Sequence, residues 1–361
     1  MRRIWYVLVG LLLGLAPAAV PCAAELQPNF LLAAGLADKP TYVIVVEKDL
    51  QQLSLWRSAA KVTQLLRLPC STGENRGRKR VSGDRKTPEG VYFFTHHFKA
   101  AVLAARYGTR AFPLDYPNCF DRRAGRGGYS IWLHGTNRPL KKRNSNGCIV
   151  LANADIDRLA EYIVLERTPL VIVKRIHYGP ALMRNRQARM LLTFLEYWNI
   201  ALTCSPAGSF RELYDRACAS GLNWLPAWEA LDKRLVAAGV SFYTSFEAPV
   251  IYHYGMDYVI EFVQYLTMNG KNRRVGRRRM YVAQNGADFR VLEDRFLRRA
   301  GKDSVKADDP LVKLAREGLH RVRPAAGTCA WSKPPAAAYP EAACRGVAYF
   351  EQNSGKHHHY R

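Results

Sequence analysis

One cluster of residues has the types and spacing that nucleophilic catalysis requires. His134 ends an apolar stretch, and Cys148 follows Gly147 in a polar loop further along the chain. A free thiol has a pKa of about 8.5, but a neighbouring imidazole can accept its proton and leave a reactive thiolate. Gly147 permits a sharp turn, so that backbone amides near Cys148 can point at a developing oxyanion. The alternative interpretation is a structural cysteine beside an unrelated histidine.

The surroundings of this pair favour the catalytic interpretation. His134-Gly135-Thr136-Asn137 and Ser145-Asn146-Gly147-Cys148 are accompanied by four ordered blocks, at 70–75 (CSTGEN), 83–92 (GDRKTPEGVY), 111–118 (AFPLDYPN) and 147–153 (GCIVLAN). This pattern resembles the YkuD-type L,D-transpeptidase family, in which a histidine precedes a Ser/Thr-x-Gly-Cys loop. Several blocks in order are a far more specific signal than one motif.

The resemblance implies a role for individual residues of this chain. Cys148 would be the nucleophile and His134 the general base, while the carbonyl of Gly135 would orient the imidazole in place of an Asp. The oxyanion hole and pocket would be formed by Ser145, Asn146 and Gly147, and the substrate would be contacted by Arg85, Thr87 and Arg138. No metal and no cofactor are expected.

Two departures from the family pattern concern the substrate. Asn146 stands where the family usually has His, and Val150 stands where it often has Arg. The second departure removes a charge that could hold a substrate carboxylate.

The family's reaction implies peptidoglycan stem peptides as the partners. The thiolate attacks the carbonyl of the third residue of a tetrapeptide stem, D-alanine leaves, and a thioester remains. An amine acceptor makes the enzyme an L,D-transpeptidase, which is the expected activity; water makes it an L,D-carboxypeptidase, which is the alternative. A non-catalytic wall-binding protein is a further alternative, against which the intact Cys148 and His134 argue.

We expect residues 40–176 to form the domain that positions these groups. β-Branched and aromatic runs predict strands at 41–46, 53–56, 91–94, 129–134 and 169–173. Asn153 is a good N-cap for a helix whose apolar residues share one face. The domain is therefore expected to be mostly β, and the family resemblance implies a β-sandwich with a packed helix.

Residues 188–298 differ in pattern from the mostly β region before them, with helices first and strands afterwards, and this order predicts an α+β accessory domain. Helices are expected around 191–198, 210–214 and 224–240, and strands over 241–254, 258–268, 278–283 and 289–296. This order resembles the cone-shaped nuclear-transport-factor-2-like fold, and YkuD domains joined to such a module include cell-shape L,D-carboxypeptidases. The basic run Lys271–Arg279 is expected on a strand–strand turn that faces an anionic surface.

The two ends of the chain indicate compartment and partners. Residues 1–24 have the layout of a signal peptide, with basic Arg2 and Arg3, an apolar run and small residues near Ala24. Secretion across the inner membrane to the periplasm or cell envelope is expected; an uncleaved anchor, or a lipoprotein attached through Cys22, is the alternative. Residues 300–361 form a basic, Ala/Pro-rich tail that is expected to be loosely ordered.

The formal net charge of +24 favours polyanionic partners. Outside the cytoplasm these are the anionic cell wall or membrane surface, which basic patches would contact, and no nucleic acid is expected. Six cysteines remain besides Cys22 and Cys148, and their order suggests the disulfides 70–119, 204–218 and 329–344 out of fifteen possible connectivities. A zinc site is not expected because no pair has CxxC spacing.

Overall fold

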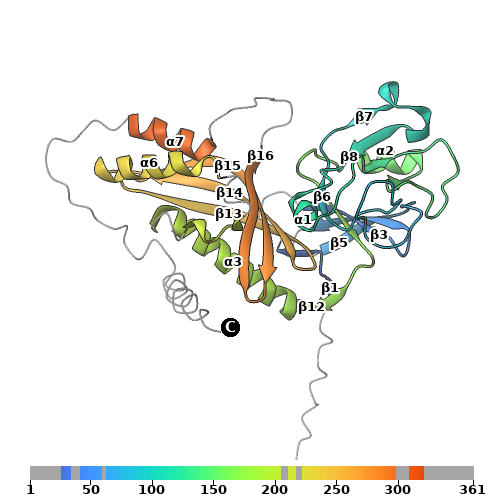
Figure 1. Ribbon diagram of the computed structural model, residues 1–361, viewed down its shortest axis with the longest axis horizontal. Coiled ribbons are helices and arrows are strands. Elements are labelled where there is room, and N and C mark those ends of the chain that lie inside the picture. Colours follow the sequence, from blue (N-terminus) through green and yellow to red (C-terminus); the bar gives the residue numbers. More distant parts are fainter. Residues whose placement is uncertain are drawn as a thin grey trace, which may run out of the picture.

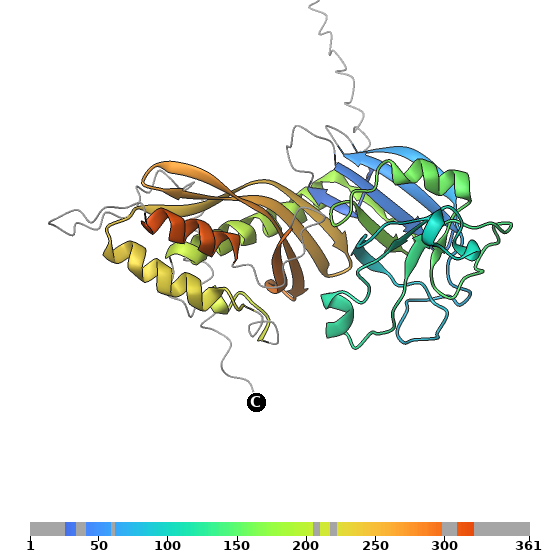
Figure 2. The ribbon, with the colours of Figure 1, turned by 90° about the horizontal axis from the view of Figure 1, so that it is seen from above.

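The computed structural model describes residues 26–33, 41–58, 62–204, 210–216, 222–297 and 309–320. These ranges form two strand-rich units that lie next to each other (Figures 1 and 2). No helix within them is long and apolar enough to cross a membrane. The expected signal peptide at 1–24 lies outside the described residues, as does most of the tail.

The N-terminal unit contains a five-stranded sheet in the order β5-β4-β3-β11-β6. Its strands are β3 (Thr41–Glu47), β4 (Gln52–Ser58), β5 (Val62–Pro69), β6 (Gly90–Phe93) and β11 (Pro169–Val173). β11 pairs parallel with β3 and antiparallel with β6. Every residue of β11 is buried, which explains why its sequence is continuously apolar rather than alternating.

A second, four-stranded sheet carries the residues predicted to be catalytic. It has the order β10-β9-β8-β7, with β7 (Phe98–Lys99), β8 (Arg110–Pro113), β9 (Trp132–His134) and β10 (Ile149–Val150). A core of apolar side chains that includes Ile44, Leu133 and Ile156 joins the two sheets to helix α2 (Asn153–Ala160).

The predicted helix cap differs by one residue. Ala152 is the N-cap of α2, and Asn153 is the first helical residue. The Asn153 side chain instead accepts a hydrogen bond from the backbone amide of Thr109, at 3.1 Å. This residue therefore ties the helix to the loop before β8.

The C-terminal unit is an antiparallel sheet with helices packed against it. The sheet order is β16-β15-β14-β13-β2, from β13 (Phe242–Tyr254), β14 (Asp257–Met268), β15 (Lys271–Asn285), β16 (Asp288–Leu297) and the N-terminal β2 (Leu31–Ala33). Helices α3 (Ala181–Cys204) and α6 (Leu225–Ala237) bury Trp198 and Trp228 in the core. Of the helix expected around 210–214, only Phe210 and Arg211 are helical; the chain then turns, and Tyr214 forms a bridge to Val291.

Part of the tail is helical, contrary to the expectation of loose order. Helix α7 (Pro310–His320) buries Leu311, Val312 and Ala315 in the core of the C-terminal unit. These three residues form an apolar helical face that packs against the core. The prediction missed this helix because it was based on the average composition of the whole tail.

The basic run is not a surface turn, which corrects a second expectation. Arg278 and Arg279 lie in β15 and are fully buried. Arg278 is paired with Asp294, and Arg279 with Glu261 at 2.6 Å. Within the run, the exposed cations are Lys271 and Arg274.

The two units meet in one cluster of buried apolar side chains, called the seam below, which contains Phe93, Phe120, Tyr252 and Tyr281. Phe93 of the first unit packs on Tyr252 of the second, with ring centroids 6.2 Å apart, and Phe120 packs on Tyr281 at 5.5 Å. Two short N-terminal strands reinforce the seam, because β1 (Leu26–Pro28) pairs with β12 (Tyr178–Pro180) while β2 pairs with β13.

No disulfide joins Cys70 to Cys119, which corrects that predicted pair. Both thiols are buried, but Cys70 belongs to the core between the N-terminal sheets and Cys119 to the seam cluster. The other two predicted pairs involve residues whose side chains lie outside the described part of the chain.

Candidate active site

Two parallel strands set the position of the predicted nucleophile relative to the predicted base. In the β9–β10 pair, Val150 is opposite His134 and Ile149 is opposite Leu133. Cys148 immediately precedes β10, so this register sets it against the start of β9. Its Sγ lies 3.6 Å from the carbonyl oxygen of Ser130. Residues that are distant in sequence are thus held together by a sheet rather than by a flexible loop.

The imidazole of His134 is oriented as expected. Its Nδ1 lies 2.7 Å from the carbonyl oxygen of Gly135. A carbonyl only accepts hydrogen bonds, so this contact assigns the proton to Nδ1 and leaves Nε2 as the basic nitrogen. The Gly135 carbonyl therefore fixes the orientation and the tautomer of the ring.

The environment favours a neutral resting pair. Burial lowers the pKa of His134; the bond to Gly135 opposes this shift, and the positive charge of Arg106 adds to it. Removal from water raises the pKa of the Cys148 thiol, against smaller opposite effects of the Trp132 backbone and Lys79. Both shifts disfavour a thiolate–imidazolium pair, so the thiol proton should move to Nε2 only as the thiol attacks.

The loop at residues 145–148, called the nucleophile loop below after the predicted role of Cys148, is held closed by hydrogen bonds between its own residues. Ser145 Oγ donates to the Cys148 carbonyl at 2.6 Å and accepts from the Gly147 amide at 3.1 Å. Gly147 has φ +126°, and a Cβ there would lie 2.8 Å from the Lys86 carbonyl oxygen. Only glycine fits this turn. The Gly147 amide, expected to help form an oxyanion hole, is engaged by Ser145, whereas Asn146 is exposed.

Thr87 supports the nucleophile loop instead of facing the substrate. Its side chain has no exposed surface. Its hydroxyl donates to the Gly147 carbonyl at 2.8 Å and accepts from the Gly73 amide at 2.8 Å. A residue without accessible surface cannot contact a substrate, so its predicted role as a substrate contact is wrong.

The two arginines predicted to contact the substrate are on the surface. Arg85 forms an ion pair with Glu74 at 2.7 Å, and both side chains are exposed. Arg138 is also exposed, and its backbone amide donates to the Thr136 hydroxyl. Of the two, Arg85 already has a carboxylate partner.

Comparison with known proteins identifies the unit that contains this site. Residues 41–172 match the family model of the L,D-transpeptidase catalytic domain, YkuD. This part of the chain is a YkuD domain. The match includes every residue predicted to act in the site. A search of curated protein sequences finds no match.

Solved structures extend the likeness beyond the YkuD domain. Bdellovibrio bacteriovorus Bd1075 is 25% identical and has a TM-score of 0.63; the alignment covers 77% of this chain and 100% of that one. The helical cell shape determining protein Pgp2 from Campylobacter jejuni is 21% identical with a TM-score of 0.54, over 74% of this chain and 96% of that one. The shared fold therefore includes the C-terminal unit.

Two aromatic residues of the YkuD domain border the site and were not foreseen. The Tyr107 ring meets the His134 imidazole edge-on, with centroids 5.0 Å apart and an interplanar angle of 89°. Tyr107 also packs on Trp132 at 5.0 Å and carries the Arg106 guanidinium over its ring. Tyr107 lies in a short 3-10 turn without sequence periodicity, so no pattern signalled its position.

Proposed function

We propose that this protein is a cysteine-dependent acyltransferase that acts on tetrapeptide stems of peptidoglycan in the cell envelope. The observation that supports this best is the geometry at β9 and β10. There, Cys148 lies two residues before the register partner of His134, whose Nδ1 is bound to a backbone carbonyl, inside a YkuD domain. The family implies the stem-peptide substrate and the extracytoplasmic location.

The reaction starts from a neutral Cys148 thiol and a neutral His134 imidazole that carries its proton on Nδ1. Cys148 Sγ attacks the carbonyl carbon of the third stem residue while its proton passes to Nε2 of His134. The C–N bond to D-alanine then breaks, and the departing amine takes the proton from Nε2. A thioester on Cys148 remains. The incoming acceptor gives a proton to Nε2, attacks the thioester and releases the thiolate, which recovers that proton.

An amine acceptor gives an L,D-transpeptidase, with a 3–3 cross-link or an attached protein as product. Water gives an L,D-carboxypeptidase, the second candidate. Two points support water: the chain resembles YkuD proteins with an accessory module, which include cell-shape L,D-carboxypeptidases, and its likeness to Pgp2, a protein described as determining helical cell shape, runs through both units. We infer that the C-terminal unit is a nuclear-transport-factor-2-like cone that serves this activity by binding.

Purified protein incubated with disaccharide-tetrapeptide and analysed by mass spectrometry tests the proposal. Loss of D-alanine without dimers indicates carboxypeptidase action, and dimers indicate transpeptidase action. The Cys148→Ala variant should give neither product and should not be acylated by a carbapenem. No reaction of the wild-type protein would refute the assignment and favour a non-catalytic wall-binding protein, whereas turnover by Cys148→Ala would exclude Cys148 as the nucleophile.

A further inference from the structure

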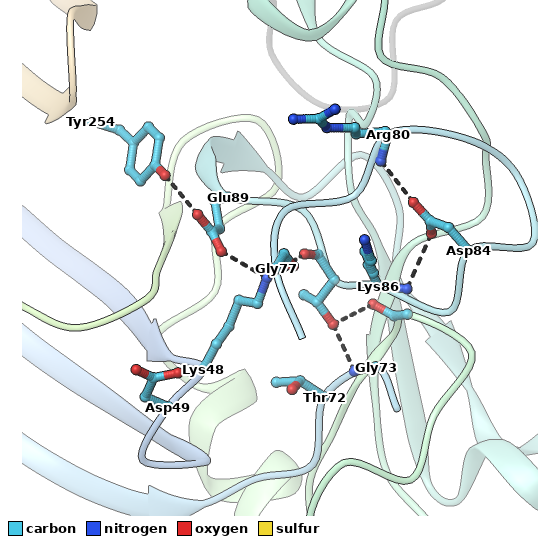
Figure 3. A network of polar contacts seen from close by, with 12 residues as sticks. Lys48, Asp49, Thr72, Gly73, Gly77, Arg80, Asp84, Lys86, Glu89 and Tyr254 are labelled. Atoms are coloured by element: carbon cyan, nitrogen blue, oxygen red, sulfur yellow. Dashed lines mark hydrogen bonds and ion pairs between the residues drawn. The ribbon is translucent and has the colours of Figure 1, made fainter. Parts of the chain in front are cut away.

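A buried lysine, Lys48, lies at the centre of a hydrogen-bond network that includes Gly77 and Glu89 (Figure 3). Lys48 is 2% exposed. Its ammonium donates to the carbonyls of Gly77 at 2.5 Å and Thr87 at 2.7 Å, and to Glu89 Oε1 at 2.8 Å. All three donor hydrogens are thus used, and Lys48 fixes three points of the segment 77–89 relative to the end of β3.

The counterion of Lys48 is held by the C-terminal unit. The second carboxylate oxygen of Glu89 accepts a hydrogen bond from the Tyr254 hydroxyl at 2.8 Å. Figure 3 shows Tyr254 approaching Glu89 from the side opposite Lys48. Tyr254 is the last residue of β13, and the Arg78 guanidinium lies 5.1 Å from its ring centroid. Two contacts of Tyr254 therefore restrain the segment 77–89 across the seam.

The same segment holds the nucleophile loop through Thr87. The Thr87 carbonyl binds Lys48, and the Thr87 hydroxyl donates to the carbonyl of Gly147, the residue before Cys148. Tyr254, Glu89, Lys48, Thr87 and Gly147 thus form a chain of four hydrogen bonds, each 2.7–2.8 Å long. Charged members make such bonds stronger than neutral ones, and buried chains reinforce one another.

We propose that Tyr254 of the C-terminal unit is a positioning residue for the Cys148 nucleophile, acting through Glu89, Lys48 and Thr87. The inference rests on the proposed function for its effect on turnover. Its effect on the thiol does not depend on the identity of the substrate. The C-terminal unit then contributes to the precision of the nucleophile loop in addition to any binding of the wall.

The seam supplies a matched control. Tyr281 of the C-terminal unit donates to Asp115 of the YkuD domain at 3.3 Å. The other oxygen of Asp115 accepts from the Phe93 amide in β6, not from the nucleophile loop. Tyr254→Phe and Tyr281→Phe each remove one hydroxyl from the seam, so their difference isolates the connection to Gly147.

The test compares both variants in the full-length protein. Three quantities are measured: the melting temperature, kcat and KM on disaccharide-tetrapeptide, and the rate at which iodoacetamide alkylates Cys148 without substrate. Tyr254→Phe should lower kcat about three- to tenfold with little change in KM, and should shift the rate or the pH profile of alkylation. Tyr281→Phe should leave kcat and alkylation unchanged.

Equal kcat values and equal alkylation profiles in the two variants would overturn the proposal and reduce Tyr254 to a seam contact. If the wild-type protein does not turn over the tetrapeptide, the alkylation rates still decide. A changed profile in Tyr254→Phe alone would then support the positioning role while the proposed function fails.

Discussion

Replacing Thr87 with valine tests whether this residue supports the nucleophile loop. The substitution keeps the side-chain shape but exchanges the hydroxyl for a methyl group, at a position without exposed surface. Two hydrogen bonds are lost, and the buried Gly73 amide and Gly147 carbonyl lose a partner. At about 1 kcal/mol for each bond, with a further penalty for unsatisfied buried groups, the unfolding free energy should fall by about 2–4 kcal/mol.

The assay is thermal unfolding combined with steady-state kinetics. A loss of that size should lower the melting temperature by about 5–15 °C in a domain of this length. It should also lower kcat, because the turn at Gly147 sets the position of the Cys148 Sγ. Thr87→Ser is the control, since it retains the hydroxyl and should recover most of both losses. An unchanged melting temperature with a raised KM alone would refute this reasoning and restore Thr87 as a substrate contact.

Three further predictions concern the base, a buried carboxyl and the exposed cations. His134→Ala should slow turnover about 10²-fold and slow alkylation of Cys148 at neutral pH; an unchanged pH profile of alkylation would mean that another group is the base. Burial raises the pKa of Asp115 from 3.8 to about 6. Folding stability should therefore fall by about 3 kcal/mol as pH rises through this window. Asp115→Asn should flatten that fall in denaturant unfolding between pH 4 and 8, and an equally steep fall in the variant would exclude Asp115 as its source. Neutralising exposed Lys271 and Arg274 should weaken salt-sensitive binding to peptidoglycan sacculi and spare turnover of a soluble muropeptide, whereas equal losses on both would place these cations in the active cleft.

Several strands could be predicted because their signals are local. Residues 169–173 form β11 with the predicted bounds, since a strand buried on both faces must be continuously apolar. The expected strand at 241–254 differs from β13 by one residue at its start. The pairing of His134 with Cys148 as base and nucleophile came from the family resemblance and stays a prediction; the register of β9 and β10 puts Val150, two residues after Cys148, opposite His134.

The role of Thr87 could not be predicted because it depends on a distant partner. A threonine beside a glycine-rich loop has the same local signal whether it faces solvent or the core. Only the contact with Gly147, sixty residues away, decides between them.

The buried arginines show the same limit for charge. Neighbouring residues of a strand point to opposite faces, and here both faces are covered. Arg278 stacks near Trp198 under the helices, and Arg279 stacks on Phe93 at the seam. Their counterions, Asp294 and Glu261, come from adjacent strands, so two charges of a run that normally indicates a solvated surface are neutralised inside the protein.

The pairing of β2 with β13 makes the C-terminal unit discontinuous along the chain. Leu31 lies opposite Tyr252, so the edge of this sheet is completed by a segment that precedes the entire YkuD domain. A fragment that starts at residue 188 would leave one edge of β13 open, and open edges promote aggregation through strand pairing. During synthesis β2 is made more than two hundred residues before β13, so the contact between them has a high sequence separation. Contacts of this kind form slowly, and we expect this one to form late in folding. The isolated fragment should become soluble when a peptide containing residues 26–33 is added, by fragment complementation at the β13 edge.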